Sequence, residues 1–142
     1  MRRAIYAVML AAASGAAHAA VTASEAWVRG TVPAQTATGA FVTLESTEEA
    51  KLVSVTTPAA ASAEIHASEE RGGVMHMHAL DALPLPAGRR VELKPGSFHI
   101  MLVGLTRALS AGERVPLTFT IEDRNGRRTR VEVRAEVRAL GR

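Results

Sequence analysis

The fold is decided most clearly by residues 115–137, which read VPLTFTIEDRNGRRTRVEVRAEV. Polar or small residues alternate in the first half with a run of apolar ones, Val115, Leu117, Phe119 and Ile121. That period belongs to a strand with one buried face. A second alternating run follows, and Asn125-Gly126 between the runs is a strong signal for a two-residue hairpin turn. The stretch predicts antiparallel strands over residues 115–123 and 128–137.

The same pattern extends outward through the chain. Seven further candidate strands cover residues 24–29, 39–46, 51–57, 62–67, 74–80, 90–94 and 98–102. Turn residues separate them, notably Arg71-Gly72-Gly73 and Lys94-Pro95-Gly96-Ser97. Short strands with turns about every 8–12 residues predict an all-β fold, a Greek-key β-sandwich or barrel.

The first 19 residues have the features of a secretory signal peptide. Arg2 and Arg3 precede an apolar run over residues 4–13, and Ala17-His18-Ala19 has the small-x-small pattern of a cleavage site. The run is shorter than the about 20 residues that span a bilayer. A short buried helix or a membrane anchor is the alternative. We expect cleavage of residues 1–19, export to the periplasm, and one β-domain over residues 20–142.

The charge balance excludes some classes of function. Removal of Arg2 and Arg3 from the 17 Lys and Arg residues leaves 15 basic against 14 acidic side chains. We therefore expect no nucleic-acid binding. The late arginines alternate with Glu132 and Glu136, which is typical of a solvated strand face.

Cysteine is absent from the sequence. We therefore expect no lipid-attached anchor, no thiol redox chemistry and no blue-copper site, since that site needs a cysteine thiolate. No later segment is long and apolar enough to cross a membrane, so we expect no membrane insertion after signal cleavage.

Histidine and methionine gather in one window of the exported chain. All seven lie between residues 66 and 101: His66, Met75, His76, Met77, His78, His99 and Met101. Imidazole and thioether together favour copper over magnesium, calcium or manganese. A set of neutral donors suits the monovalent ion, Cu(I).

The strand period selects members of that window. His99 and Met101 are two residues apart on a strand and therefore share a face. A hairpin through Gly72-Gly73 could bring Met77 near His66, and the turn at Pro95-Gly96 would return His99 and Met101. We therefore predict a metal site at one rim of the barrel, where three strand ends converge, made of His66, Met77, His99 and Met101.

Each residue has an ordinary alternative. Methionine often fills cores, and core packing is the favoured interpretation for Met75 and an equal one for Met77. A single histidine is more often a surface residue than a ligand. His76 and His78 are expected to be exposed, and a weak second metal site formed by this pair is an alternative.

The spacing of the four residues resembles the PCu(A)C family of periplasmic copper chaperones. The family pattern is a His, ten residues, a Met, twenty-one residues and His-x-Met, and His66, Met77, His99 and Met101 match it in type and spacing. Segments 26–29, 39–44, 73–77, 93–96 and 101–105 also resemble the family. Some members carry a Met directly after the first His, where this chain has Ala67.

The resemblance implies a cupredoxin-like fold and one Cu(I) per chain at a solvent-accessible site. It also implies delivery of copper toward the binuclear copper centre of cytochrome c oxidase, to subunit II directly or through a Sco-type thiol protein. A copper storage or resistance protein with the same site is one alternative, and a metal-free β-sandwich interaction module is another. No Ser-His-Asp spacing or carboxylate pair stands out, so we expect no enzyme.

Overall fold

The computed structural model describes residues 19–139, so the expected signal peptide lies almost entirely outside the described residues. These residues form strands and no helix, and hence no helix capable of crossing a membrane is found among them. The strands are β1 (Val21–Arg29), β2 (Ala37–Ser46), β3 (Ala50–Thr56), β4 (Ala60–Arg71), β5 (Val74–Leu80), β6 (Leu83–Leu85), β7 (Arg90–Leu93), β8 (His99–Leu105), β9 (Arg114–Asp123) and β10 (Arg128–Arg138).

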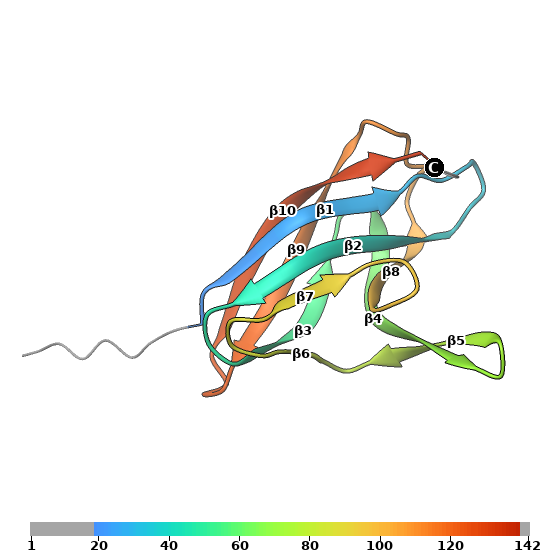
Figure 1. The fold of residues 1–142 in the computed structure, drawn as a ribbon. Coiled ribbons are helices and arrows are strands. Elements are labelled where there is room, and N and C mark those ends of the chain that lie inside the picture. Colours follow the sequence, from blue (N-terminus) through green and yellow to red (C-terminus); the bar gives the residue numbers. More distant parts are fainter. Residues whose placement is uncertain (1–18, 140–142) are drawn as a thin grey trace, which may run out of the picture.

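Seven strands close into a barrel, in the order β4-β8-β2-β1-β10-β9-β3 (Figure 1). The closure from β3 back to β4 rests on one residue pair, Val55 with Ala63. β1 and β10 run parallel, and the other paired strands run antiparallel. The all-β prediction is confirmed, and of its two forms the barrel is the one observed.

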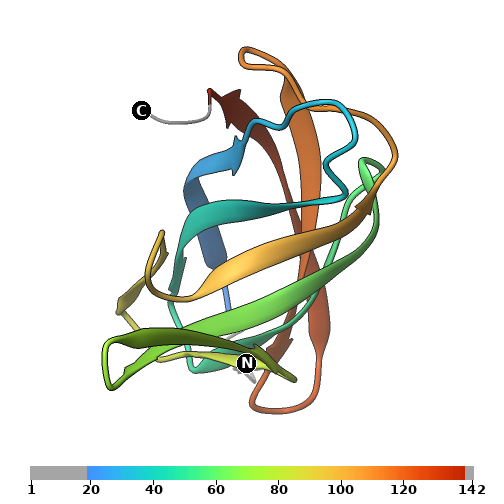
Figure 2. The same cartoon turned by 90° about the vertical axis from the view of Figure 1, so that its right-hand side faces the viewer.

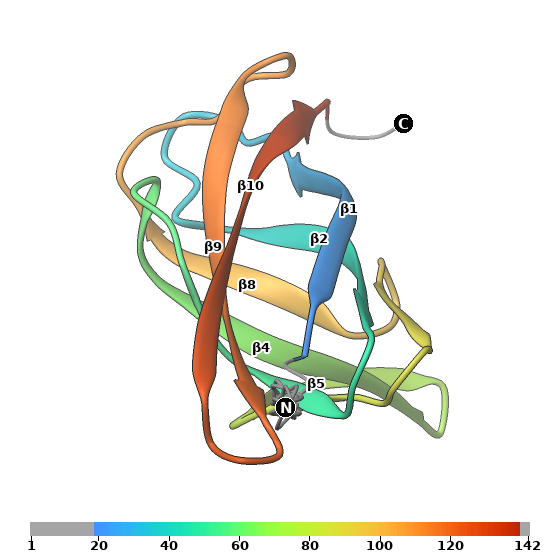
Figure 3. The same cartoon turned by 90° about the vertical axis from the view of Figure 1, so that its left-hand side faces the viewer.

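The barrel core is built from the inward faces of alternating strands. In β9 the four predicted apolar positions are all at most 1% exposed: Val115, Leu117, Phe119 and Ile121. In β10 the inward residues include Ala135 and Val137, also buried. β9 and β10 pair side by side along their length and form one wall of the barrel (Figure 3). Alternation in the sequence therefore identified the core face correctly.

The turn between β9 and β10 differs from the predicted two-residue turn. The backbone N–H of Asp123 donates to the carbonyl of Arg127, so three residues, 124–126, form the loop. Asp123 Oδ1 accepts hydrogen bonds from the N–H groups of Asn125 and Arg127, each at 2.9 Å. Gly126 has φ of +79°, as expected where a type I turn runs into a bulge. The side chain of Asp123 therefore stabilises the longer loop.

The β4–β5 hairpin extends beyond the barrel (Figure 2). Gly72 and Gly73 form its two-residue turn with φ of +57° and +81°, the conformation that type I′ turns require. Pairing continues up to Arg71 with Val74, so β4 is several residues longer than predicted. Only Leu80 at the base of β5 is even partly buried. β5 therefore contributes almost no buried side chains to the hairpin.

One strand, β6, was not predicted because Pro84 lies at its centre. It pairs with β3 at the end of the sheet order, and proline is tolerated at a sheet edge. Its flanking residues Leu83 and Leu85 are buried in the core. β7 and β8 then pair in succession with the same edge of β2, and the loop between them lies beside the residues described next.

Candidate metal centre

His66 and His99 lie directly opposite each other on β4 and β8. Their rings are tilted by 51°, with centroids 5.5 Å apart. The neighbouring pair, Ile65 with Ile100, points into the core, so the two histidines face outward. His99 is nevertheless only 5% exposed, and the His66 side chain 16%. The pair is sheltered on the outer face of the barrel.

The ring of His99 is oriented by the turn before β8. Ser97 N–H donates to the carbonyl of Lys94 at 3.0 Å, and Gly96 has φ of +83°, which is the geometry of a type II turn with Pro95 before the glycine. The turn directs the Ser97 carbonyl at His99 Nδ1, 3.2 Å away. A carbonyl oxygen only accepts, so Nδ1 carries the proton and Nε2 of the neutral ring keeps a free lone pair.

The ring of His66 is oriented by a carboxylate on its own strand. Glu64 precedes it by two residues and therefore shares its face. His66 Nε2 donates to Glu64 Oε2 at 2.7 Å. In the neutral ring the lone pair is then on Nδ1. A carboxylate or carbonyl on the far nitrogen is the usual support of a metal-binding histidine.

The two remaining nitrogens, His66 Nδ1 and His99 Nε2, are buried and have no hydrogen-bond partner within residues 19–139. A buried polar atom without a partner is costly, so such atoms are rare unless a ligand satisfies them. Metal–imidazole bonds are about 2.0–2.1 Å long, so two rings that bind one ion have centroids within roughly 6.4 Å of each other. The observed 5.5 Å meets that limit.

Met101 lies next to this pair on β8. It faces outward like His99, and its neighbours across the sheet are Glu64 on β4 and Gly39 on β2. A Cβ atom at Gly39 would lie 3.0 Å from the ring of Phe41, so the glycine leaves room for that ring. Gly39, Phe41 and Met101 all line a shallow hollow on this face.

Met77 reaches the same hollow from β5. It is paired with Ser68, which lies two residues beyond His66 on the same face of β4. Met77, His99 and Met101 together line a depression of about 110 Å³. Its other lining residues are Arg29, Gly39, Phe41, Ser68, Pro95 and Gly96. His66 is not on that lining and joins the group through its contact with the His99 ring.

All four predicted residues therefore lie on one outer face. His99 begins β8, but His66 and Met77 lie within β4 and β5, so the predicted convergence of three strand ends is not observed. That they hold a metal ion stays a prediction. Core packing of Met75 and Met77 is wrong, because these side chains are 49% and 59% exposed. His76 and His78 are exposed, as expected.

No group of three or more His, Cys, Asp or Glu side chains is arranged to hold a metal within the described part of the chain. A site made only of nitrogen and carboxylate ligands is therefore not found there. His76 and His78 likewise gain no third ligand of these types.

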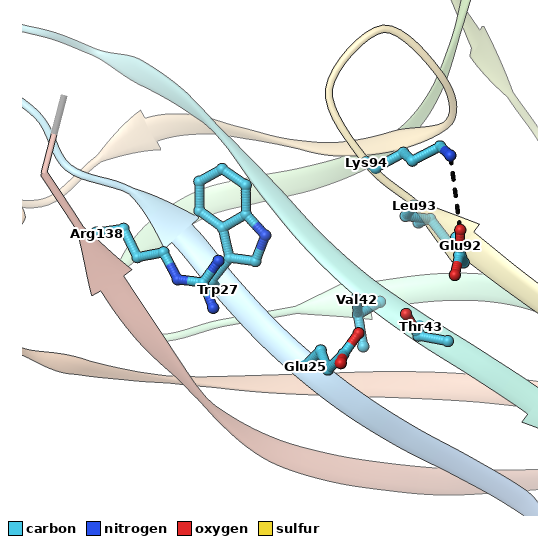
Figure 4. Close-up of a pocket in the computed structure, with 8 residues that line it drawn as sticks. All are labelled: Glu25, Trp27, Val42, Thr43, Glu92, Leu93, Lys94 and Arg138. Atoms are coloured by element: carbon cyan, nitrogen blue, oxygen red, sulfur yellow. Dashed lines mark ion pairs between the residues drawn. The ribbon is translucent and has the colours of Figure 1, made fainter. Parts of the chain in front are cut away.

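An aromatic pair that sequence reasoning missed adjoins the depression. Trp27 and Phe41 stack with ring centroids 4.4 Å apart. A wider groove of about 350 Å³ begins at Trp27 and runs between β1, β2 and β7 toward Glu92, which pairs with Lys94 (Figure 4). Among residues 19–139, no histidine or methionine lines this larger groove, whereas Met77, His99 and Met101 line the smaller hollow.

Comparison with known proteins supports the fold described above. The copper-bound PCuAC domain from PmoF2 superposes with a TM-score of 0.67 at 21% identity, over 84% of this chain and 92% of that domain. The Cu(I)-bound DR1885 from Deinococcus radiodurans has a TM-score of 0.60 at 31% identity, over 90% and 83% of the two chains. The LpqE-like family model matches residues 21–137.

The chain belongs to the PCuAC family. The expected cupredoxin-like fold is thereby confirmed. PCuAC domains are copper-binding chaperone domains and not enzymes, which also confirms the expectation of a non-enzymatic protein.

A relative from Leifsonia xyli subsp. xyli, named "Putative lipoprotein Lxx21020", is 34% identical over 104 residues. The alignment covers 72% of this chain and 63% of that protein. The lipoprotein names of this relative and of the family model indicate an extracytoplasmic protein, in agreement with the expected export.

Proposed function

We propose that this protein is a periplasmic carrier that binds one Cu(I) ion with His66, Met77, His99 and Met101. The observation that carries the proposal is the pair of buried, unpartnered nitrogens, His66 Nδ1 and His99 Nε2, with ring centroids 5.5 Å apart. Two thioethers on the same face supply the soft donors that Cu(I) prefers.

The charge and exposure of the donors suit a carrier. Two neutral imidazoles and two thioethers add no negative charge, which favours the monovalent ion. His99 is buried and held in place by the barrel, while Met77 is 59% exposed. Solvent and a partner can therefore reach the proposed site at Met77. An incoming ligand can reach the ion at Met77 without disturbing the barrel.

Copper stoichiometry tests the binding site. The exported chain is titrated with Cu(I) in competition with a chromogenic chelator, for the wild type and for Met77→Leu and Met101→Leu. We expect one ion per chain and weaker binding in both variants. Met75→Leu is the matched control, because Met75 shares the strand and the exposure of Met77 but does not line the depression. Unchanged affinity in both Met77 and Met101 variants would rule out the site.

We further propose that the carrier delivers copper toward the binuclear centre of cytochrome c oxidase, to subunit II directly or through a Sco-type thiol protein. The exposed Met77 and the open depression support release to a partner. The test mixes the Cu(I)-loaded carrier with the soluble domain of each acceptor and follows the copper by size-exclusion chromatography. Retention of copper by the carrier against both acceptors would favour storage.

A further inference from the structure

A positive side chain lines the same depression as three of the four proposed copper ligands. Arg29 is the last residue of β1 and lines the depression together with Met77, His99 and Met101. Its guanidinium carbon lies 5.6 Å from the centroid of the Phe41 ring. Among the described residues, no carboxylate forms an ion pair with it at a distance of 4 Å or less.

This placement opposes copper binding. The four proposed ligands are neutral, so a bound Cu(I) keeps its full positive charge, and Arg29 adds a second one in the same depression. Like charges repel more strongly when they are partly sheltered from water. The carboxylate of Glu64 accepts a hydrogen bond from His66 and keeps its charge, but it does not line the depression. Arg29 therefore does not serve to hold the ion.

Packing on an aromatic ring does not distinguish Arg29, because a second arginine makes the same kind of contact. Arg138 stacks on Trp27 in the same way, with its guanidinium carbon 5.0 Å from the ring centroid, but it lies outside the depression. What distinguishes Arg29 is its position beside Met77 and Met101. Two positive charges at one open hollow attract an anion, and the anionic donor that a soft ion prefers is a thiolate.

We propose that Arg29 makes the depression a docking site for a cysteine thiolate of the copper acceptor. The inference rests on the proposed function and specifies how the ion leaves. A guanidinium next to a thiol also favours its ionised form, which is the form that binds copper.

The exchange step conserves charge and oxidation state. The acceptor thiol loses its proton to solvent, and the thiolate lone pair forms a new copper–sulfur bond. The bond from copper to the exposed Met77 sulfur breaks, and its electron pair returns to the thioether. Copper remains Cu(I) throughout, so no oxidant or reductant is needed. Arg29 stabilises the thiolate on approach and does not bind copper.

Transfer kinetics test the proposal. The Cu(I)-loaded protein is mixed in a stopped-flow instrument with either of two acceptors, a peptide with two cysteines or an uncharged peptide with methionine and neutral histidine. Arg29→Gln is expected to slow transfer to the cysteine peptide about tenfold, the lower end of electrostatic steering. Transfer to the uncharged peptide stays unchanged or becomes faster. Arg29→Lys retains most of the wild-type rate.

Arg138→Gln is the matched control and should change neither rate, because it removes an equivalent ring contact outside the depression. Added salt should slow the wild type toward the rate of Arg29→Gln. Equal slowing with both acceptors would indicate a packing role and overturn the proposal, and so would an unchanged rate with the cysteine peptide.

The two proposals fail in different ways. Arg29→Gln should still bind one Cu(I) per chain, whereas Met77→Leu and Met101→Leu should bind it more weakly. Normal copper affinity in both methionine variants would refute the proposed site. Weakened methionine variants together with wild-type transfer kinetics in Arg29→Gln would refute the thiolate docking site alone.

Discussion

The two faces of β4 and β8 differ in almost every property, although they are formed by the same residues in alternation. The inward pair, Ile65 and Ile100, is apolar and at most 4% exposed. The outward pair, His66 and His99, carries two unpartnered nitrogens and lies beside the thioether of Met101. One strand pair thus supplies the core on one side and the candidate metal centre on the other, so stability and copper binding should be separable by mutation.

The largest expected effect is on the inward face. Ile100→Ala should lower the free energy of unfolding by about 2–5 kcal/mol, because Ile100 is fully buried and the substitution leaves a cavity. Urea denaturation measures the loss. The fraction that remains folded should still bind one Cu(I). A loss well under about 1 kcal/mol would show that the two faces do not differ in packing as described.

Met101→Leu should have the opposite effects: the free energy of unfolding should change little, and Cu(I) affinity should fall strongly. The side chains are similar in volume and the site is partly exposed, so the stability change should stay below about 1.5 kcal/mol. Cu(I) affinity should fall by more than the about 10–100-fold that loss of an outer-sphere partner typically causes. Chelator competition measures the affinity. If Met101→Leu were strongly destabilised but bound copper normally, the assignment of stability to the inward face and copper binding to the outward face would be wrong.

Glu64→Ala should weaken copper binding less, by about 10–100-fold, because Glu64 orients His66 but does not line the depression. Glu64→Gln keeps an acceptor oxygen and should lie between the alanine variant and the wild type. Nitrogen-15 NMR of the metal-free protein should show the His66 proton on Nε2 in the wild type. A mixture of tautomers in the wild type would contradict the assigned role.

Gly73→Ala should affect the hairpin and spare the barrel. Gly73 has φ of +81° with no atom near the position of a new Cβ, so the cost of about 1–2 kcal/mol comes from the backbone alone. Amide exchange should accelerate in β5 and remain slow in β9. Copper affinity should fall only modestly, since β5 supplies one of the four donors. Equal acceleration in both strands would mean that hairpin and barrel unfold together.

The smallest effect is expected at Glu113, which does not line the depression. The backbone N–H of Ser110 and then the side chain of Arg107 hold its pKa below the usual 4.5. The native state thus gains stability from Glu113 above about pH 4.5 and loses it as pH falls through the lower folded pKa. The difference in unfolding temperature between wild type and Glu113→Gln should shrink from pH 7 to about pH 3. A constant difference would argue against this linkage.

Local sequence patterns predicted the fold well where a single segment carries the information. The type I′ turn at Gly72-Gly73 and the type II turn at Pro95-Gly96 depend on residue types that suit those dihedral angles. The loop at Asn125 was misjudged because Asp123 side-chain hydrogen bonds favour a longer turn. β6 was missed because proline in a short run gives no alternation signal.

The site was only partly predictable, because its geometry depends on register between distant strands. Spacing on one strand could pair His99 with Met101. The opposition of His66 and His99 depends on how β4 meets β8, which no local pattern encodes. The role of Glu64 in orienting His66 could have been predicted from one feature: the carboxylate lies two residues before the histidine and therefore on the same face of the strand. Arg29 and Phe41, on β1 and β2, lie in segments that resemble the family, but no sequence pattern placed them beside the histidines and methionines.

The direct opposition of the two histidines across β4 and β8 has a consequence for how errors in assembly are handled. A slip of one residue between these strands would separate the imidazoles and also turn isoleucine outward into water. A chain that misaligns the two histidines therefore also exposes apolar surface. We expect proteases to degrade such misfolded copies before they bind a metal ion incorrectly.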